Sequence, residues 1–363
     1  MLKRSLDRLP DLKDQTRFDW IRSGLGLDMG VDLGTANTLI FVAGRGVVLT
    51  QPSYVAIDTK NEVVIAVGED AREMVGRSPG HIEVVRPLSS GVIADVDAAQ
   101  HMLREFTLRV HQRRRFVKPR VVVSVPSGVN TIERHAVEQA VIQAGARRVD
   151  VISEPLAAAI GAGLPVGEPR GSMVIDIGGG TTEVAVIVMG SILASTSLRV
   201  AGDAIDSAIV AFIRKEHGIL VGERTAEKIK MQAASAWAGV REVNVEILGR
   251  DLTTGKPRTV HIKAEELRGA ISEPVGDIVD AAVGVFDRLP AEIVRDIASA
   301  GVVMTGGGAL LPGLDRRFES DLGVRVRLDP EPMTCVVRGA GMLLNGATRD
   351  GGAEKQKEDA VVS

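Results

Sequence analysis

The chain has 363 residues, of which 45% are apolar and 3% aromatic, and its formal net charge is −3 at pH 7. This length favours two domains, and the near-neutral charge argues against a nucleic-acid-binding protein, which usually carries a basic excess. The single cysteine, Cys335, excludes an intrachain disulfide and a cysteine-rich metal site, and favours a reducing cytoplasm. No apolar run reaches the roughly 18 residues that span a membrane, and the start lacks the features of a secretory signal. We therefore expect a cytoplasmic protein.

Residues 1–27 precede the first clear strand and form an N-terminal extension. Leu2, Leu6 and Leu9 recur there at helical spacing among basic residues, until Pro10 ends the pattern. This short stripe, opposed by Asp7, is a candidate amphipathic anchor, and a frayed chain end explains it equally well.

The stretch "MGVDLGTANTLIFVAG" (residues 29–44) predicts two strands separated by an unusual turn. The first strand is apolar and ends at Asp32, and small hydroxyl and amide residues follow at once. Hairpins usually turn on Asn-Gly or Asp-Gly, and this turn contains neither pair. One interpretation is nevertheless an ordinary turn. The other is a site at which backbone N–H groups, the Thr35 and Thr38 hydroxyls and the Asp32 carboxylate hold something small and anionic.

The segment "RVHQRRRFVKPR" (residues 109–120) places Phe116 and Val117 between three arginines and Lys118. An apolar pair ringed by cations is suited to an anionic lipid surface, which attracts each nearby basic residue by about 1 kcal/mol. The alternative is that Phe116 packs beneath its own loop.

Strand-like and helix-like segments alternate in the middle of the chain. The run "PRVVVSVP" (residues 119–126) predicts a buried strand. Residues 131–146 predict a helix that ends near Gly145, with Ile132, Ala136, Ala140 and Ala144 on one face. A second helix of small residues is predicted from residue 154. This alternation is typical of an α/β protein.

The stretch "VIDIGGGTTEVAVIVMG" (residues 174–190) repeats the first hairpin. An apolar strand again ends in an acid, Asp176, and a glycine-rich turn with Thr181 and Thr182 leads into another strand. The repetition predicts two similar halves, each with one acidic hairpin. Two such turns across a cleft would grip a phosphate chain with backbone amides. Asp32 and Asp176 would then hold a metal ion through its waters, which magnesium gives up reluctantly.

A third glycine cluster, "VVMTGGGALLPGLDRRF" (residues 302–318), follows a predicted strand and opens a helix. Its glycines would let the backbone approach a flat ligand closely. The chain contains no GxxxxGK[ST] run, so it is not a P-loop enzyme. The polar residues 346–363 predict a disordered tail.

With these three motifs in this order, the chain resembles the actin/chaperone-ATPase/sugar-kinase superfamily. Within it, "DLGTANTLIFV", "DIGGGTTEVAVI", "TGGGALLPGLD", "RPLSSGVIADVD", "EPLAAAIGAGLPV", "GERTAEKIK" and "EPMTCVVRGAG" resemble the MreB family of bacterial actin-like proteins. The resemblance covers about residues 28–345. It implies an actin-like α/β fold with two related domains, residues 28–165 and 166–345, that flank a nucleotide cleft and each carry a smaller subdomain. The second subdomain is expected near residues 205–275, and a membrane-facing loop near residues 113–118.

The resemblance also implies which residues bind ATP. The phosphates would be contacted from one side by Thr35, Ala36 and Asn37, and from the other by Gly179, Gly180 and Thr181. The ribose and adenine edge would be held by Glu227, Lys228, Ile229 and Lys230. Glu227 and Lys230 are three residues apart in a predicted helix and so share one side, although a solvated surface pair has the same spacing. The adenine pocket would be lined by Gly307, Gly308, Ala309 and Leu310.

Glu133 matches the family glutamate that positions the attacking water, and would act in catalysis together with Asp176. A carboxylate in the first turn of a helix is also a routine partner of the helix dipole, worth about 0.3–1 kcal/mol. Two residues depart from the family pattern. Asn130 stands where a threonine is usual, and Ser153 replaces an acid beside Glu154. Both changes are expected to slow hydrolysis or to alter the hydration of the metal ion.

The resemblance therefore implies slow, magnesium-dependent ATP hydrolysis coupled to polymerisation. The partners would be further copies of the chain, the anionic inner face of the cell membrane and proteins of cell-wall elongation, without nucleic acid. The filaments would organise cell-wall synthesis and so help to determine cell shape. Two alternatives on the same fold are a sugar or acetate kinase, for which no spare acceptor pocket is evident, and a chaperone ATPase, which would carry a long substrate-binding domain after residue 345.

Overall fold

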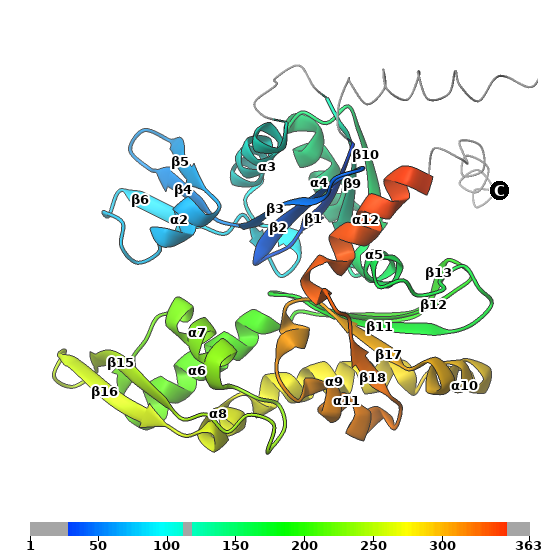
Figure 1. Ribbon diagram of the computed structural model, residues 1–363. Helices are drawn as coiled ribbons and strands as arrows, with labels where there is room; N and C mark the ends of the chain where they lie inside the picture. Colours follow the sequence, from blue (N-terminus) through cyan, green and yellow to red (C-terminus); the bar gives the residue numbers. More distant parts are fainter. Residues whose placement is uncertain (1–27, 112–117, 347–363) are drawn as a thin grey trace, which may run out of the picture.

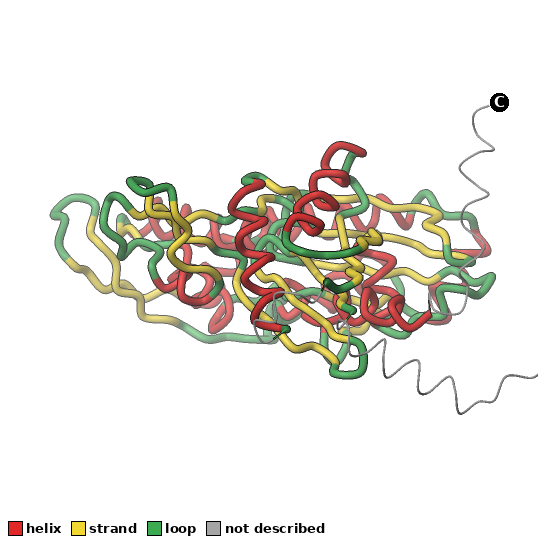
Figure 2. The backbone as a smooth tube through the Cα atoms, turned by 90° about the horizontal axis from the view of Figure 1, so that it is seen from above, coloured by secondary structure: helices red, strands yellow, loops and turns green. Residues whose placement is uncertain are grey.

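The structure is a computed structural model that describes residues 28–111 and 118–346, and it consists of two halves, each built on a five-stranded sheet (Figure 1). Figure 2 shows the molecule from above, and in this view it is narrower than in Figure 1. The candidate anchor in residues 1–27, the pair Phe116 and Val117, and the tail after residue 346 lie outside the described residues.

The sheet of the first half has the order β10-β9-β1-β2-β3. Its strands are β1 (Met29–Leu33), β2 (Asn37–Val42), β3 (Gly46–Pro52), β9 (Arg120–Val125) and β10 (Arg148–Ser153). Helices α3 (Val96–Val110), α4 (Thr131–Gln143) and α5 (Glu154–Gly161) belong to the same part of the chain. A small extension contains β4 (Val55–Asp58), β5 (Val63–Val67), α2 (Glu69–Glu73) and β6 (Ile82–Val85), and a short ladder joins β7 (Leu88–Ser89) to β8 (Val92–Ile93).

The sheet of the second half has the order β13-β12-β11-β17-β18. Its strands are β11 (Ser172–Ile177), β12 (Thr182–Val188), β13 (Ser191–Leu198), β17 (Val302–Thr305) and β18 (Val326–Leu328). Its extension contains α6 (Gly202–His217), β14 (Ile219–Leu220), α7 (Glu223–Ala233), β15 (Val245–Asp251), β16 (Pro257–Ile262) and α8 (Ala264–Ala270). The remaining helices are α9 (Ser272–Phe286), α10 (Ala291–Ala300), α11 (Leu314–Leu322) and α12 (Cys335–Gly346), with 3-10 turns at Gly308–Leu310 and Pro332–Thr334.

The two sheets have the same topology. In each, the first three strands form an antiparallel meander, a fourth strand pairs in parallel with the first, and a fifth pairs in parallel with the fourth. The pairing of the second and third strands carries a register shift in both halves. This confirms the duplication that the repeated acidic hairpin predicts.

Most predicted elements form where the sequence places them. Residues 119–126 contain β9, and residues 131–146 contain α4, which ends at Gln143 just before the positive φ of Gly145. The face of α4 differs from the prediction, because Val137, Ala140 and Val141 are buried whereas Ile132 is 81% exposed. Asn130 caps this helix by accepting a hydrogen bond from the Glu133 N–H at 2.9 Å.

The halves are joined by two helices that cross closely, α5 and α12 (Figure 1). A Cβ on Gly161 would collide with the carbonyl of Cys335, and one on Gly339 with the carbonyl of Ala157. Only glycine permits this approach of two backbones. A shared apolar core surrounds the crossing and draws on both sheets, including Val122 of the first. The two halves therefore meet over a close-packed contact.

Candidate functional site

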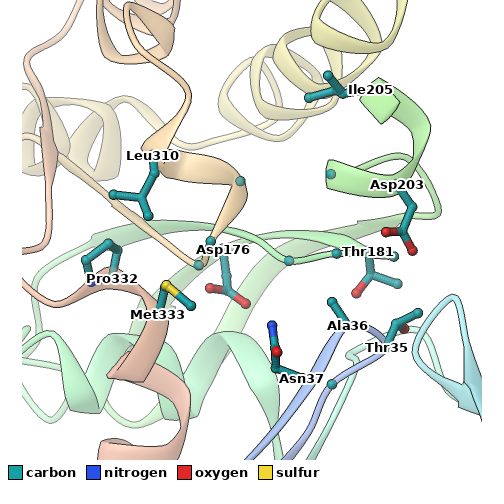
Figure 3. A pocket seen from close by; sticks show the side chains of 18 of the residues that line it. Thr35, Ala36, Asn37, Asp176, Thr181, Asp203, Ile205, Leu310, Pro332 and Met333 are labelled. Carbon is teal, nitrogen blue, oxygen red and sulfur yellow. The ribbon is translucent and has the colours of Figure 1, made fainter. Parts of the chain in front are cut away.

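A cavity of about 350 Å³ lies between the halves, and residues from both line it (Figure 3). Its lining comprises Asp32, Gly34, Thr35, Ala36, Asn37, Leu39, Gly91, Glu154, Asp176, Gly178, Gly179, Gly180, Thr181, Gly202, Asp203, Ile205, Asp206, Glu227, Lys230, Met231, Arg241, Gly306, Gly307, Gly308, Leu310, Leu311, Pro312, Pro332, Met333 and Val336. The volume falls within the usual range of small-molecule pockets.

The two hairpins face each other at one end of this cavity (Figure 3). A Cβ on Gly179 would stand 2.6 Å from the Cβ of Ala36, and one on Gly180 would stand 2.7 Å from the Thr35 hydroxyl oxygen. The Thr35 hydroxyl oxygen in turn accepts a hydrogen bond from the Gly91 N–H at 3.0 Å. The glycines thus bring the turn of the second half against that of the first, as expected for two turns that grip one ligand.

Each hairpin aspartate is held by a hydroxyl from the neighbouring parallel strand. Thr305 on β17 lies beside Asp176 in the ladder and donates to its Oδ1 at 2.6 Å. Ser124 on β9 donates to Oδ1 of Asp32 at 3.2 Å. Ser124 follows Val123, which pairs with Val31, and Thr305 follows Met304, which pairs with Ile175. The hydroxyl that holds each aspartate is therefore duplicated together with the hairpin.

The floor of the cavity concentrates negative charge. Burial is the main cause that raises the pKa of Asp32 to about 7 and that of Asp176 to about 6, and for Asp32 the nearby Asp176 adds to the shift. Burial, followed by the charges of Asp32, Glu183 and Asp176, raises the pKa of Glu154 well above its ordinary value. Acids held this way favour a cation or a proton between them.

A magnesium ion fits these acids through its water molecules. Within the described ranges, no group of three or more His, Cys, Asp or Glu side chains is placed to coordinate a metal ion directly. The chemistry of two opposed, desolvated carboxylates matches a hydrated dication, because magnesium retains several waters and needs few carboxylates.

The start of α6 lies beside the second hairpin, where the N–H groups of Gly202 and Asp203 donate to the carbonyls of Gly178 and Gly179, and α7 and the third glycine cluster line the cavity with it. Lys230 donates to Oδ2 of Asp206 at 2.8 Å and to the carbonyl of Gly202 at 2.9 Å. Burial raises the pKa of Asp206 to about 6, although Lys230 acts in the opposite direction. Leu310, Pro332 and Met333 add apolar surface on the far side (Figure 3). This part of the cavity suits a flat, partly apolar ligand group.

The structure brings most of the sequence-predicted site residues to this cavity. Those that line it are Asp32, Thr35, Ala36, Asn37, Asp176, Gly179, Gly180, Thr181, Glu227, Lys230, Gly307, Gly308 and Leu310. Three others lie nearby but outside the lining. Ile229 and Ala309 are buried in the core of the second half, and Lys228 is exposed. Each of the three is a neighbour in sequence of a residue that does line the cavity.

Glu133 is also outside the lining. Its side chain accepts a hydrogen bond from the Asn130 N–H at 2.9 Å, which completes a reciprocal cap at the start of α4. Glu154, which the sequence prediction did not choose, lines the cavity instead. Its signal in the sequence is a Glu-Pro pair at the start of the predicted small-residue helix, which in the structure follows directly on β10.

A further charged contact joins the two halves at Asp203, which lines the cavity. Arg86 of the first half donates to Oδ2 of Asp203 on α6 at 2.5 Å, and to the Tyr54 hydroxyl at 2.9 Å. The Arg86 guanidinium also lies over the Tyr54 ring. These residues are far apart in the sequence, and no local pattern pairs them.

Comparisons with known proteins agree with this geometry. Residues 26–351 match the profile of the MreB/Mbl protein family. The cell shape-determining protein Mbl of Bacillus subtilis is 45% identical over 318 residues, which cover 88% of this chain and 96% of Mbl. The cell shape-determining protein MreB of Escherichia coli K12 is 46% identical over 331 residues, or 90% of this chain and 95% of that protein.

Solved structures show the same fold. MreB5 of Spiroplasma citri bound to ADP superimposes with a TM-score of 0.85 at 35% identity, over 90% of this chain and 99% of that one. The same protein bound to AMPPNP gives the same values. The double helical filament of MamK shares the fold at a TM-score of 0.74 and 20% identity, over 88% of this chain and 98% of MamK. Among the helices that the structure describes, none combines the length and apolarity of a membrane span.

Proposed function

Since this chain belongs to the MreB/Mbl family, we propose that it is an actin-like ATPase that assembles into filaments and takes part in determining cell shape. The observation that carries the proposal is the pair of facing hairpins, with the half-buried Asp32 and the buried Asp176 between them in one cavity. The relatives are named cell shape-determining proteins, and MreB5 was solved with ADP and with AMPPNP.

The cavity would hold ATP along its length. The turns with Thr35 and with Gly179 and Gly180 would cradle the phosphates with backbone N–H and hydroxyl donors. Glu227 and Lys230 would contact the ribose, and the turn at Gly307 and Gly308 would pack against the adenine. Magnesium, held by Asp32 and Asp176 through its waters, would supply charge neutralisation at the β- and γ-phosphates.

Hydrolysis needs a group that orients water in line with the γ-phosphate. The sequence resemblance gives this role to Glu133, and we propose it on that ground; Glu154, which lines the cavity together with both aspartates, is the second candidate. One pair of variants decides between them. Glu133→Gln should lower kcat by about a hundredfold with nucleotide affinity retained. If Glu154→Gln has this effect and Glu133→Gln does not, the role belongs to Glu154.

ATP would contact both halves, so its binding favours the closed arrangement, and closed subunits would add to a filament. The test is ATP-dependent sedimentation of the purified chain, with the same chain in the absence of nucleotide as the control. Pelleting that requires ATP supports the proposal. A chain that hydrolyses ATP but stays in the supernatant at every concentration favours the kinase or chaperone alternative.

Membrane association is part of the proposal and rests on the sequence. The loop with Phe116 and Val117 would insert into the anionic inner face of the membrane, and a filament would gain avidity from many such loops. Phe116→Ser with Val117→Ser should weaken cosedimentation with anionic vesicles but leave filament formation intact. Loss of both activities would favour packing of Phe116 within the protein. Proteins of cell-wall elongation are the proposed partners, and residues 28–165 and 166–345 the proposed domains.

A further inference from the structure

Glu183 is a buried acid to which the proposed mechanism gives no role. It follows Thr181 and Thr182 of the second hairpin, on β12, and lies directly opposite Asp176 in the ladder. Its residue surface is 0% exposed. A carboxylate removed from water is costly unless hydrogen bonds compensate it, so its partners indicate what it does.

The partners of Glu183 come from both halves of the molecule. Its Oε2 accepts from the backbone N–H of Ser127 at 3.1 Å and from the Ser127 hydroxyl at 2.5 Å. Its Oε1 accepts from the Ser197 hydroxyl at 2.5 Å. Ser127 follows β9 in the first half, whereas Ser197 lies on β13 in the second. One carboxylate therefore ties a loop of the first half to the sheet of the second.

The loop that Glu183 holds, residues 126–130, is connected to the first hairpin. It continues β9, whose Ser124 donates to Asp32. It also packs tightly beside Gly91, where a Cβ would collide with Pro126, and the Gly91 N–H donates to Thr35. At its other end the loop enters α4 through the Asn130 cap. A displacement of this loop would thus reach both the aspartate and the threonine of the first hairpin.

The contacts suit a hydrogen-bonded bridge. The hydrogen bonds from Ser127 and Ser197 lower the pKa of Glu183, against the larger effect of burial, which raises it. Gly128 also packs against the side chain of Ser197, where a Cβ would stand 3.0 Å from the serine Cβ. The junction therefore has little room for water to replace the carboxylate.

We propose that Glu183 is a positioning residue that couples the nucleotide-bound second hairpin to the loop at residues 126–130, and through it to Asp32. The inference rests on the proposed ATPase function. When nucleotide fixes Thr181 and its neighbours, Glu183 fixes the loop, and the first hairpin is held in the arrangement that hydrolysis requires. Without the hydrogen bonds of Glu183, ATP still binds, but its contact with the second hairpin no longer fixes the loop at residues 126–130 and the first hairpin.

The experiment compares Glu183→Leu, Glu183→Gln and Ser127→Ala with the parent chain. Ser195→Ala is the matched control, because it removes a hydroxyl two residues before Ser197 on β13 without a hydrogen bond to Glu183. Three quantities are measured: the Kd for AMPPNP, kcat and KM for ATP, and hydrogen exchange of residues 120–133 with and without AMPPNP.

In Glu183→Leu we expect a Kd within about threefold of the parent, a kcat about tenfold lower, and loss of the exchange protection that AMPPNP gives to residues 120–133. Ser127→Ala should show the same pattern more weakly. Glu183→Gln should retain most of the parent kcat and exchange protection, because the glutamine carbonyl can accept a hydrogen bond from Ser127 while its amide donates to Ser197. Ser195→Ala should match the parent.

Parent-like kcat and protection in Glu183→Leu would overturn the inference, as would a glutamine variant no better than leucine. If Glu183→Leu does not fold, Ser127→Ala combined with Ser197→Ala removes both hydroxyl donors and carries the same expectations. A parent chain that fails to bind AMPPNP would overturn the proposed function itself, and this inference with it. Binding with unchanged coupling would overturn the inference alone.

Discussion

The two acidic hairpins share a topology but differ in what stands opposite the aspartate. Asp32 on β1 faces Leu39 on β2, whereas Asp176 on β11 faces Glu183 on β12. The supporting hydroxyls also differ, since Thr305 donates to Asp176 at 2.6 Å and Ser124 donates to Asp32 at 3.2 Å. The duplication thus preserves the acid and its support, while the second half adds a bridge back to the first.

The strongest test of this comparison removes each aspartate in turn. Asp176→Ala and Asp32→Ala should each lower magnesium-dependent ATP hydrolysis by about a hundredfold or more, because each removes a fixed charge beside the transferred phosphate. Steady-state phosphate release at saturating magnesium measures both. If both variants hydrolyse ATP at the parent rate, the duplicated hairpins are not the catalytic site. If only one loses activity, the halves have diverged further than their topology indicates.

A second test concerns the contact between the turns. Gly179→Ala places a Cβ 2.6 Å from that of Ala36 and should weaken nucleotide binding by about tenfold, within the range expected of overpacking. Titration with a fluorescent ATP analogue reports the Kd. Gly276→Ala on α9 is the matched control, because nothing lies within 4 Å of its Cβ. The control should bind normally and gain about 0.5–1 kcal/mol in free energy of unfolding.

The supporting hydroxyls offer a smaller effect. The hydrogen bond from Thr305 lowers the pKa of Asp176, so Thr305→Val should raise that pKa and move the acidic limb of the pH–rate profile to higher pH. Ser124→Ala should do the same for Asp32 to a lesser extent, because its hydrogen bond is longer. The profiles of kcat/KM for the two variants test this order. Equal shifts would mean that the two supports are interchangeable.

The smallest expected effect is on the stability of the metal-free protein. The pKa of Asp32 is raised to about 7 in the folded chain from 3.8, so the folded state binds more protons across that interval. Ionisation of Asp32 therefore lowers the free energy of unfolding as the pH rises from about 4 through 7. Asp32→Asn should raise the Tm without magnesium or nucleotide by about 2–4 °C at pH 8, and by less at pH 5. A larger gain at pH 5 would reverse the assigned sign.

Local patterns were sufficient to predict the parts of the site that lie on continuous segments. The hairpins at Asp32 and Asp176 can be predicted because an apolar strand, an acid and small turn residues follow one another within a few positions. The duplicated topology followed from their repetition. The helix with Glu227 and Lys230 was also predicted, and it forms as α7.

The parts that sequence did not reveal depend on contacts between distant segments. Glu154 and Glu133 have the same local signature, an acid in the first turn of a helix, and only the packing of α5 between the sheets brings Glu154 to the cavity. The pairing of Arg86 with Asp203 and the bridge at Glu183 join opposite halves. Such partners are set by the assembled fold, and no spacing within one segment encodes them.

The crossing of α5 and α12 limits how the two halves can move. Because the backbones are in direct contact at Gly161 and Gly339, the two helices have little room to slide past each other. If the halves rotate about this contact, the displacement is largest at the tips formed by β4–β6 and β15–β16, which lie far from it (Figure 1). Under the proposed function, a bound phosphate chain that draws the two hairpins together would therefore change the outline of the molecule at these tips.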